Sequence, residues 1–99
     1  MTTLVFDTDP AATHVEVTDE RLAVHLADGR MISVPLAWFP RLVHGSAEER
    51  ANWRLLGDGD AIEWPDLDEH VGVEGLLAGR GSGESEASFQ RWLAARTRG

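Results

Sequence analysis

The sequence contains no cysteine, no lysine and no long apolar run. Without cysteine the chain has no disulfide, no thiol nucleophile and no thiolate metal site, so its fold depends on packing alone. No run approaches the roughly 20 apolar residues that span a bilayer. Residues 1–9 lack the basic region and apolar stretch that begin a signal peptide. We therefore expect a cytoplasmic protein.

The charge of the chain is strongly one-sided. All nine basic residues are arginine and 17 residues are acidic, which gives a formal net charge of −8. An acidic surface repels phosphate backbones and anionic lipid. The balance therefore favours a basic protein partner, with direct nucleic-acid contact and membrane binding disfavoured. The 99 residues, 42% of them hydrophobic, fit one compact domain.

The first third of the chain has the alternation of antiparallel strands. Residues 14–17 and 21–26 alternate around a polar turn, and a third strand follows Asp28-Gly29. A two-residue turn would place Ile32 and Val34 on the wrong face of the sheet. A three-residue loop over residues 27–29, with Gly29 left-handed, instead pairs Val24 with Ile32 and Leu22 with Val34. Residues 4–6 form an edge strand or an irregular start.

Residues 35–42 mark the corner between strands and helices. Pro35 has no N–H for a strand ladder, so the third strand ends near Leu36. Helical spacing of aromatic and apolar residues then predicts a short helix over residues 37–43, with Pro40 in its first turn. Ser46 and Glu49 form a capping box, which predicts a second helix over residues 47–52.

The next segment predicts a second hairpin and one more helix. Residues 53–56 and 61–64 are short apolar stretches on either side of Gly57-Asp58-Gly59-Asp60, which is turn chemistry. Val73, Leu76 and Leu77 fit one helical turn that ends at Gly79. We expect Trp38, Trp53 and Trp64 to lie in the core or to cover the sheet.

These elements predict an α+β fold. It comprises an N-terminal antiparallel meander of about three strands, short helices and a small second hairpin packed on it, and a separate C-terminal helix. The predicted division is a domain over residues 1–79, a flexible glycine-rich linker over residues 80–84, and an amphipathic helix over residues 85–97. The apolar stripe of that helix consists of Phe89, Trp92 and Leu93.

No pattern in the sequence indicates catalysis, a metal or a cofactor. The four histidines have no paired spacing, and no G-x-S-x-G, P-loop or Ser-x-x-Lys pattern occurs. An acidic stretch does follow the second hairpin, but it has no defensible calcium-loop spacing. A solvated acidic face is therefore the better interpretation. The stretch contains Asp58, Asp60, Glu63, Asp66, Asp68, Glu69 and His70.

Five blocks of the sequence, taken together, resemble a bacterial family of unknown function, DUF2442. They are Leu26-Ala27-Asp28-Gly29-Arg30, residues 34–42 (VPLAWFPRL), residues 48–53 (EERANW), residues 64–68 (WPDLD) and residues 73–79 (VEGLLAG). The resemblance covers about residues 15–79. It implies a small α+β domain with no enzymatic activity. Some relatives continue into a helix-turn-helix, and their genes often lie beside another small protein in suspected toxin–antitoxin pairs.

The chain departs from that family in two places. Gly72 stands where relatives usually have a helix-capping serine, and the segment after Gly83 is too short for a linker and a helix-turn-helix. The second departure removes direct DNA reading as an inherited role.

The function predicted from these observations is a non-enzymatic protein-interaction domain. Its partner would be a small protein, with a neighbouring gene product or cognate toxin as the candidate, and the domain would act as an antitoxin-like or regulatory component. A homodimer through the C-terminal helix is the alternative assembly. Two other functions are a DNA-associated regulator that uses the tail arginines, and a small-molecule site beneath Trp38 and Trp64. The predicted partner-binding residues are Phe89, Trp92, Leu93, Asp66, Asp68 and Glu69.

Overall fold

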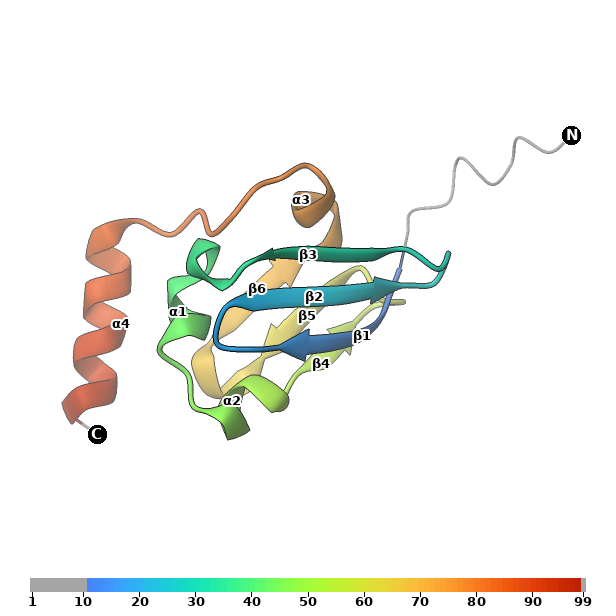
Figure 1. Ribbon diagram of the computed structural model, residues 1–99. Helices are drawn as coiled ribbons and strands as arrows, with labels where there is room; N and C mark the ends of the chain where they lie inside the picture. The colour runs from blue at the N-terminus through green and yellow to red at the C-terminus, as the bar shows by residue number, and fades with distance from the viewer. Residues whose placement is uncertain (1–10, 99) are drawn as a thin grey trace, which may run out of the picture.

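Two three-stranded antiparallel sheets form the body of the protein (Figure 1). The computed structural model describes residues 11–98, so the predicted strand over residues 4–6 lies outside the described part. The strand orders are β1-β2-β3 and β4-β5-β6. The α+β prediction is confirmed. The strands are β1 (Ala12–Val17), β2 (Arg21–Leu26), β3 (Met31–Pro35), β4 (Arg54–Leu56), β5 (Ala61–Trp64) and β6 (Glu69–Gly72).

The connection between β2 and β3 confirms the predicted register. Val24 pairs with Ile32 and Leu22 with Val34, while the backbone of Leu26 bonds to that of Arg30 around a three-residue loop. Gly29 has a φ of 95°, the left-handed conformation that glycine adopts without a Cβ clash. The hydrophobic pattern therefore selected the loop length, because a slip of one residue would have exposed the inner face.

The predicted single helix over residues 37–43 is wrong. The chain instead forms a 3₁₀ turn, η2 (Leu36–Trp38), and then the short helix α1 (Pro40–Val43). Between them Phe39 is non-helical, with φ −129° and ψ 83°. The ring of a proline excludes the residue before it from the helical region, so Pro40 starts α1 and cannot sit within a longer helix.

The helix α2 (Ala47–Ala51) begins with the predicted capping box. The Ser46 side chain accepts from the Glu49 amide at 3.1 Å, and the Glu49 carboxylate accepts from the Ser46 amide at 2.9 Å. The second hairpin, β4 with β5, is also confirmed. Sequence reasoning missed β6, because Val71 is its one inward apolar residue and its pairing with Ile62 of β5 supplies the rest.

One hydrophobic core joins the two sheets. Leu22 and Val24 from the first sheet share it with Ile62 and Trp64 from the second. Trp64 is fully buried, and its indole N–H donates to the carbonyl oxygen of Arg50 at 3.0 Å, which satisfies its one polar atom. Such a tryptophan is a structural residue, as predicted. No helix among residues 11–98 is long and apolar enough to cross a membrane.

Two helices complete the chain. The 3₁₀ turn η3 (Pro65–Leu67) precedes β6, and α3 (Val73–Leu77) follows it with Gly72 at its N-cap. Val73 and Leu76 are buried, whereas Leu77 is exposed. The predicted helix over residues 85–97 is observed as α4 (Glu86–Arg98). It stands at the end of the sheets beside α1 and is reached by a long connection from α3 (Figure 1).

Candidate functional site

The candidate site is a cavity of about 510 Å³ where α1, β6, α3 and residues 80–84 meet. Phe39 from the start of α1 and Val71 from β6 are buried residues of its wall. Gly72, Gly75, Gly81 and Gly83 also border it, so little side-chain volume fills the space. The polar groups around the cavity are charged: Arg41, Asp68, Glu69, His70, Arg80 and Glu84.

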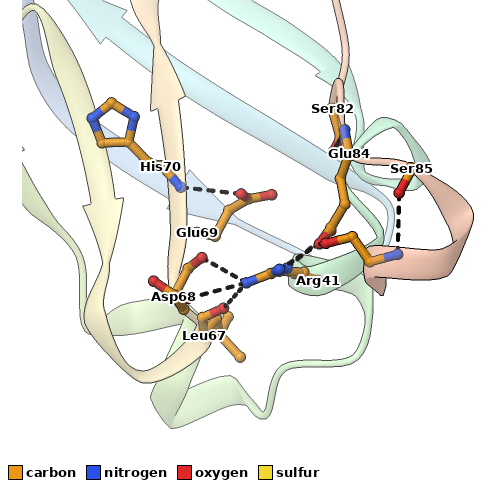
Figure 2. Close-up of polar contacts among 9 residues, drawn as sticks. Arg41, Leu67, Asp68, Glu69, His70, Ser82, Glu84 and Ser85 are labelled. Carbon is orange, nitrogen blue, oxygen red and sulfur yellow. Dashed lines mark hydrogen bonds and ion pairs between the residues drawn. The ribbon is translucent and has the colours of Figure 1, made fainter. Parts of the chain in front are cut away.

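Arg41 is the residue around which the cavity is built (Figure 2). Its Nε donates to Glu84 at 2.9 Å, and its Nη2 forms an ion pair with the same carboxylate. Its Nη1 donates to the carbonyl oxygen of Asp68 at 2.8 Å. The fork of a guanidinium suits such a multiple contact. Arg41 therefore fixes residue 84 of the connecting segment against the residue that precedes β6.

The Arg41–Glu84 pair is sheltered from solvent. The two side chains are 13% and 15% exposed. Hydrogen bonding to Arg41 lowers the pKa of Glu84 below its ordinary value, and the Ser88 hydroxyl, which donates to the same carboxylate at 2.7 Å, acts in the same direction. Glu84 is thus ionised at neutral pH and belongs to the structure of the site.

Asp68 occupies a left-handed conformation, with φ 50° and ψ 43°. It ends η3 and reverses the chain into β6. Aspartate tolerates this region better than most residues. Because the carbonyl oxygen of Asp68 accepts from Arg41, its own carboxylate can remain 92% exposed beside the cavity.

Glu69 differs from the other acids of the cavity. Burial raises its pKa above the ordinary value, and the negative charges of Glu84 and Asp68 add to that rise. Its carboxylate accepts from the backbone N–H of His70 at 3.1 Å. Within residues 11–97 no cationic atom lies within 4 Å of it, since Arg41 is committed to Glu84 and Asp68. Glu69 is therefore a half-buried carboxylate that faces a cavity without a cation of its own.

The apolar stripe of α4 packs against its own chain. The Trp92 ring lies between the guanidinium groups of Arg41 and Arg96, at 5.1 and 4.9 Å from ring centroid to Cζ. Phe89 contacts the rings of His44 and Trp92. Arg96 also bonds to Glu49, with an Nη2–Oε1 distance of 2.9 Å. The contacts are cation–π and ionic more than apolar.

The connecting segment is attached to the domain as well. Ser82 N–H donates to the carbonyl oxygen of Trp38 at 2.9 Å, and a Cβ at Gly81 would lie 3.1 Å from Trp38 Cβ. Trp38 itself is 37% exposed and lies against this segment, not in the core as predicted. The predicted division into a domain, a flexible linker and a helix remains a prediction.

The structure brings together most of the predicted partner-binding residues. Asp68 and Glu69 line the cavity, while Phe89 and Trp92 lie on α4, and Arg41 contacts both Asp68 and Trp92. Leu93 is half-buried on α4. Asp66 lies apart on η3, where it accepts from Asn52 at 2.9 Å, and it does not line the cavity.

Sequence reasoning missed the two residues that organise the site. Arg41 and Glu84 are separated by 43 positions, and no local spacing predicts that they meet. Arg41 had one available signal, because it is an arginine between the buried residues Phe39 and Leu42. A long cation in such a place needs a partner. Glu84 had none, since it follows a glycine-rich stretch.

The fold and the site together define a small α+β domain of two facing three-stranded sheets, with a charged cavity closed by its C-terminal connection. Residues 12–82 match the family described as "Protein of unknown function (DUF2442)", and the chain belongs to that family. The predicted membership is confirmed. No curated protein matches the chain.

Two solved structures share the fold. A protein of unknown function from Rhodospirillum rubrum is 24% identical, with a TM-score of 0.66; the similarity covers 81% of this chain and 96% of that one. An uncharacterised protein from Chromobacterium violaceum is 21% identical, with a TM-score of 0.64, and the coverage is 80% and 75%. At these identities the likeness concerns the fold.

Proposed function

We propose that this protein is a non-enzymatic interaction domain that captures a basic protein through the cavity beside Arg41. The carrying observation is Glu69, a half-buried carboxylate whose pKa is raised by burial and by neighbouring acids. A carboxylate in such surroundings destabilises the fold when it ionises. A lysine or arginine side chain of a partner would remove that penalty, because it would supply the missing cation.

The charges of the site and of the whole chain support the same kind of partner. Arg41 is engaged by Glu84 and by the carbonyl oxygen of Asp68, so its charge is already balanced within the protein. Asp68 adds an exposed carboxylate at the rim. The net charge of −8 would steer a basic protein toward the domain and speed its association.

The stripe on α4 supplies the second part of the proposed contact. Phe89, Trp92 and Leu93 are all half-buried, so each retains surface that a partner can cover. They lie on the opposite side of Arg41 from Glu69. A partner that inserts a basic side chain beside Glu69 could therefore also cover this stripe. Such a pairing of a charged anchor with aromatic surface is common in protein interfaces.

The test is quantitative affinity purification from the native cell with tagged wild-type protein and Glu69→Gln. The product of the neighbouring gene is the first protein to look for. We expect a basic protein whose recovery falls at least tenfold with Glu69→Gln. Glu74→Gln is the matched control, because Glu74 is an exposed acid on α3 outside the cavity. Equal recovery with both variants, or a partner without basic character, would contradict the proposal.

A truncated chain separates the two parts of the contact. We expect deletion after Gly79 to weaken capture further, because it removes both Glu84 and the stripe of α4. Unchanged capture after this deletion would remove α4 from the interface. Capture should also weaken as salt concentration rises, since it relies on opposite charges.

A further inference from the structure

A second groove, of about 620 Å³, follows the outer edge of β1. Six consecutive residues, 14–19, line it, together with Ala47, Arg50 and Ala51 from α2 and with Trp53. Successive side chains of a strand point to opposite faces of the sheet. A single groove can therefore touch six consecutive residues only if it runs beside the backbone edge of the strand.

The backbone at this edge is available for pairing. β1 pairs with β2 on one side and with no other strand of the described chain. Thr18 N–H donates to the carbonyl oxygen of Arg21 at 2.9 Å, and hydrogen-bonded pairs alternate with non-bonded pairs from there along an antiparallel ladder. Glu16 is therefore bonded to β2, whereas the N–H and C=O groups of Val15 and Val17 point outward into the groove.

The walls of the groove are small and apolar. Ala47 and Ala51 are four residues apart, so they lie on one face of α2, and both are exposed. Trp53 and Val17 are half-buried and pack against the core from this side. Arg50 closes one end, where it bonds to Asp19 at 2.8 Å. The groove is thus wide enough, beside open backbone groups, for apolar side chains of an added strand.

The charge beside the groove is negative. Glu16 is 59% exposed on the outer face of the sheet, with His14 and His25 at 3.6 and 3.7 Å from its carboxylate. Asp19 is 94% exposed. The one cation, Arg50, is committed to Asp19 and to the carbonyl oxygens of Leu42 and Val43. An incoming segment would therefore be favoured if it carried a basic side chain near Glu16.

We infer that β1 is a docking edge for an extended, basic segment of a partner protein, which adds to the first sheet as a fourth strand. The segment would carry apolar residues toward Val17, Ala51 and Trp53, and a lysine or arginine between them on the outer face near Glu16. Strand addition draws affinity from the backbone and specificity from alternate side chains. The inference rests on the proposed function in requiring a protein partner, but it uses a surface separate from the cavity.

The experiment uses a phage-displayed library of random ten-residue peptides, selected on the full-length protein and counter-selected on Ala51→Trp. A tryptophan at residue 51 would fill the groove from an exposed position of α2. We expect enriched peptides to alternate apolar and other residues and to carry a central lysine or arginine. In a ¹⁵N NMR titration, one such peptide should shift the amides of Val15 and Val17 and slow their hydrogen exchange at least tenfold.

Matched variants decide the outcome. Ala51→Trp should weaken the selected peptide at least tenfold, while Ala94→Trp, at an exposed position of α4, should leave binding unchanged. The inference is overturned if no peptide is enriched, if enriched peptides have helical periodicity, or if the amides of Val15 and Val17 do not respond. It is also overturned if the protein dimerises with those two amides already protected.

The two proposals can fail separately. Glu69→Gln should leave binding of the selected peptide unchanged, because Glu69 lies outside the β1 groove. Peptide binding that depends on Glu69 and not on Ala51 would overturn the strand-addition inference and would support the cavity instead.

Discussion

Replacement of Glu84 by glutamine should release α4 from the domain. The carboxylate accepts from Arg41 Nε at 2.9 Å, pairs with Arg41 Nη2 and accepts from Ser88 at 2.7 Å. Glutamine removes the charge and sets its amide against one of the arginine donors. Hydrogen bonds to charged groups contribute about 1.5–3 kcal/mol, and both side chains of the ion pair are largely shielded from solvent. We take that range as the loss in docking free energy.

Amide hydrogen exchange measured by NMR converts this loss into an observable. α4 has 13 residues, and an isolated helix of that length is marginal in water, so its protection depends on docking. Since about 1.4 kcal/mol is a factor of ten, the protection of α4 amides should fall about 10- to 150-fold in Glu84→Gln. The amide of Val24, in the central strand of the first sheet, should keep its protection.

Glu86→Gln is the matched control. Glu86 also lies at the start of α4, but within the described residues its carboxylate accepts from Gln90 alone. Loss of a charge at a helix N-terminus changes helix stability by about 0.3–1 kcal/mol, so protection should fall about fivefold at most. The reasoning is refuted if both variants behave alike, if Glu84→Gln has no effect, or if Val24 loses protection in parallel.

Three further predictions concern pH and backbone geometry. The pKa values of Glu49 and Glu84 are lowered by hydrogen bonds from arginine, so their stabilisation is present above the unfolded value of 4.5 and is lost as pH falls below it; α4 should lose exchange protection there before the sheets do. The pKa of Glu69 is raised, so stability falls as pH rises from 4.5 through its folded value; Glu69→Gln should raise the melting temperature at pH 7 and leave it unchanged at pH 3. Gly59→Ala should destabilise the protein by about 2 kcal/mol or more in urea denaturation, because φ is 97° and a Cβ would lie 2.5 Å from a backbone oxygen of the first strand, whereas Gly72→Ser, at an N-cap with open space, should be neutral or stabilising by a few tenths of a kcal/mol.

Several elements were predictable because their causes are local. The capping box of α2 needs only Ser46 and Glu49, and the loop before β3 follows from the positions of Ile32, Val34 and a glycine. The break at Phe39 was predictable in principle, because a proline restricts the residue before it. The helical spacing of the neighbouring aromatics concealed that signal.

The second sheet and the candidate site were less accessible. β6 has one inward apolar residue, Val71, and becomes a strand because β5 offers it a partner. The cavity depends on Arg41, which meets Glu84 from 43 positions away and Asp68 from 27. Patterns of hydrophobicity and turn residues do not contain such pairings.

The sequence by itself determined the class of the fold, the first sheet with its register, and the acidity that favours a basic partner. Those properties follow from alternation, turn chemistry and composition, which act over a few residues or over the whole chain. Only the tertiary structure decided that α4 packs beside Arg41, that Glu69 faces a cavity without a cation, and that the outer edge of β1 is open. Each of these depends on which distant segments come together as the common core forms, and on which polar groups that packing leaves without a partner.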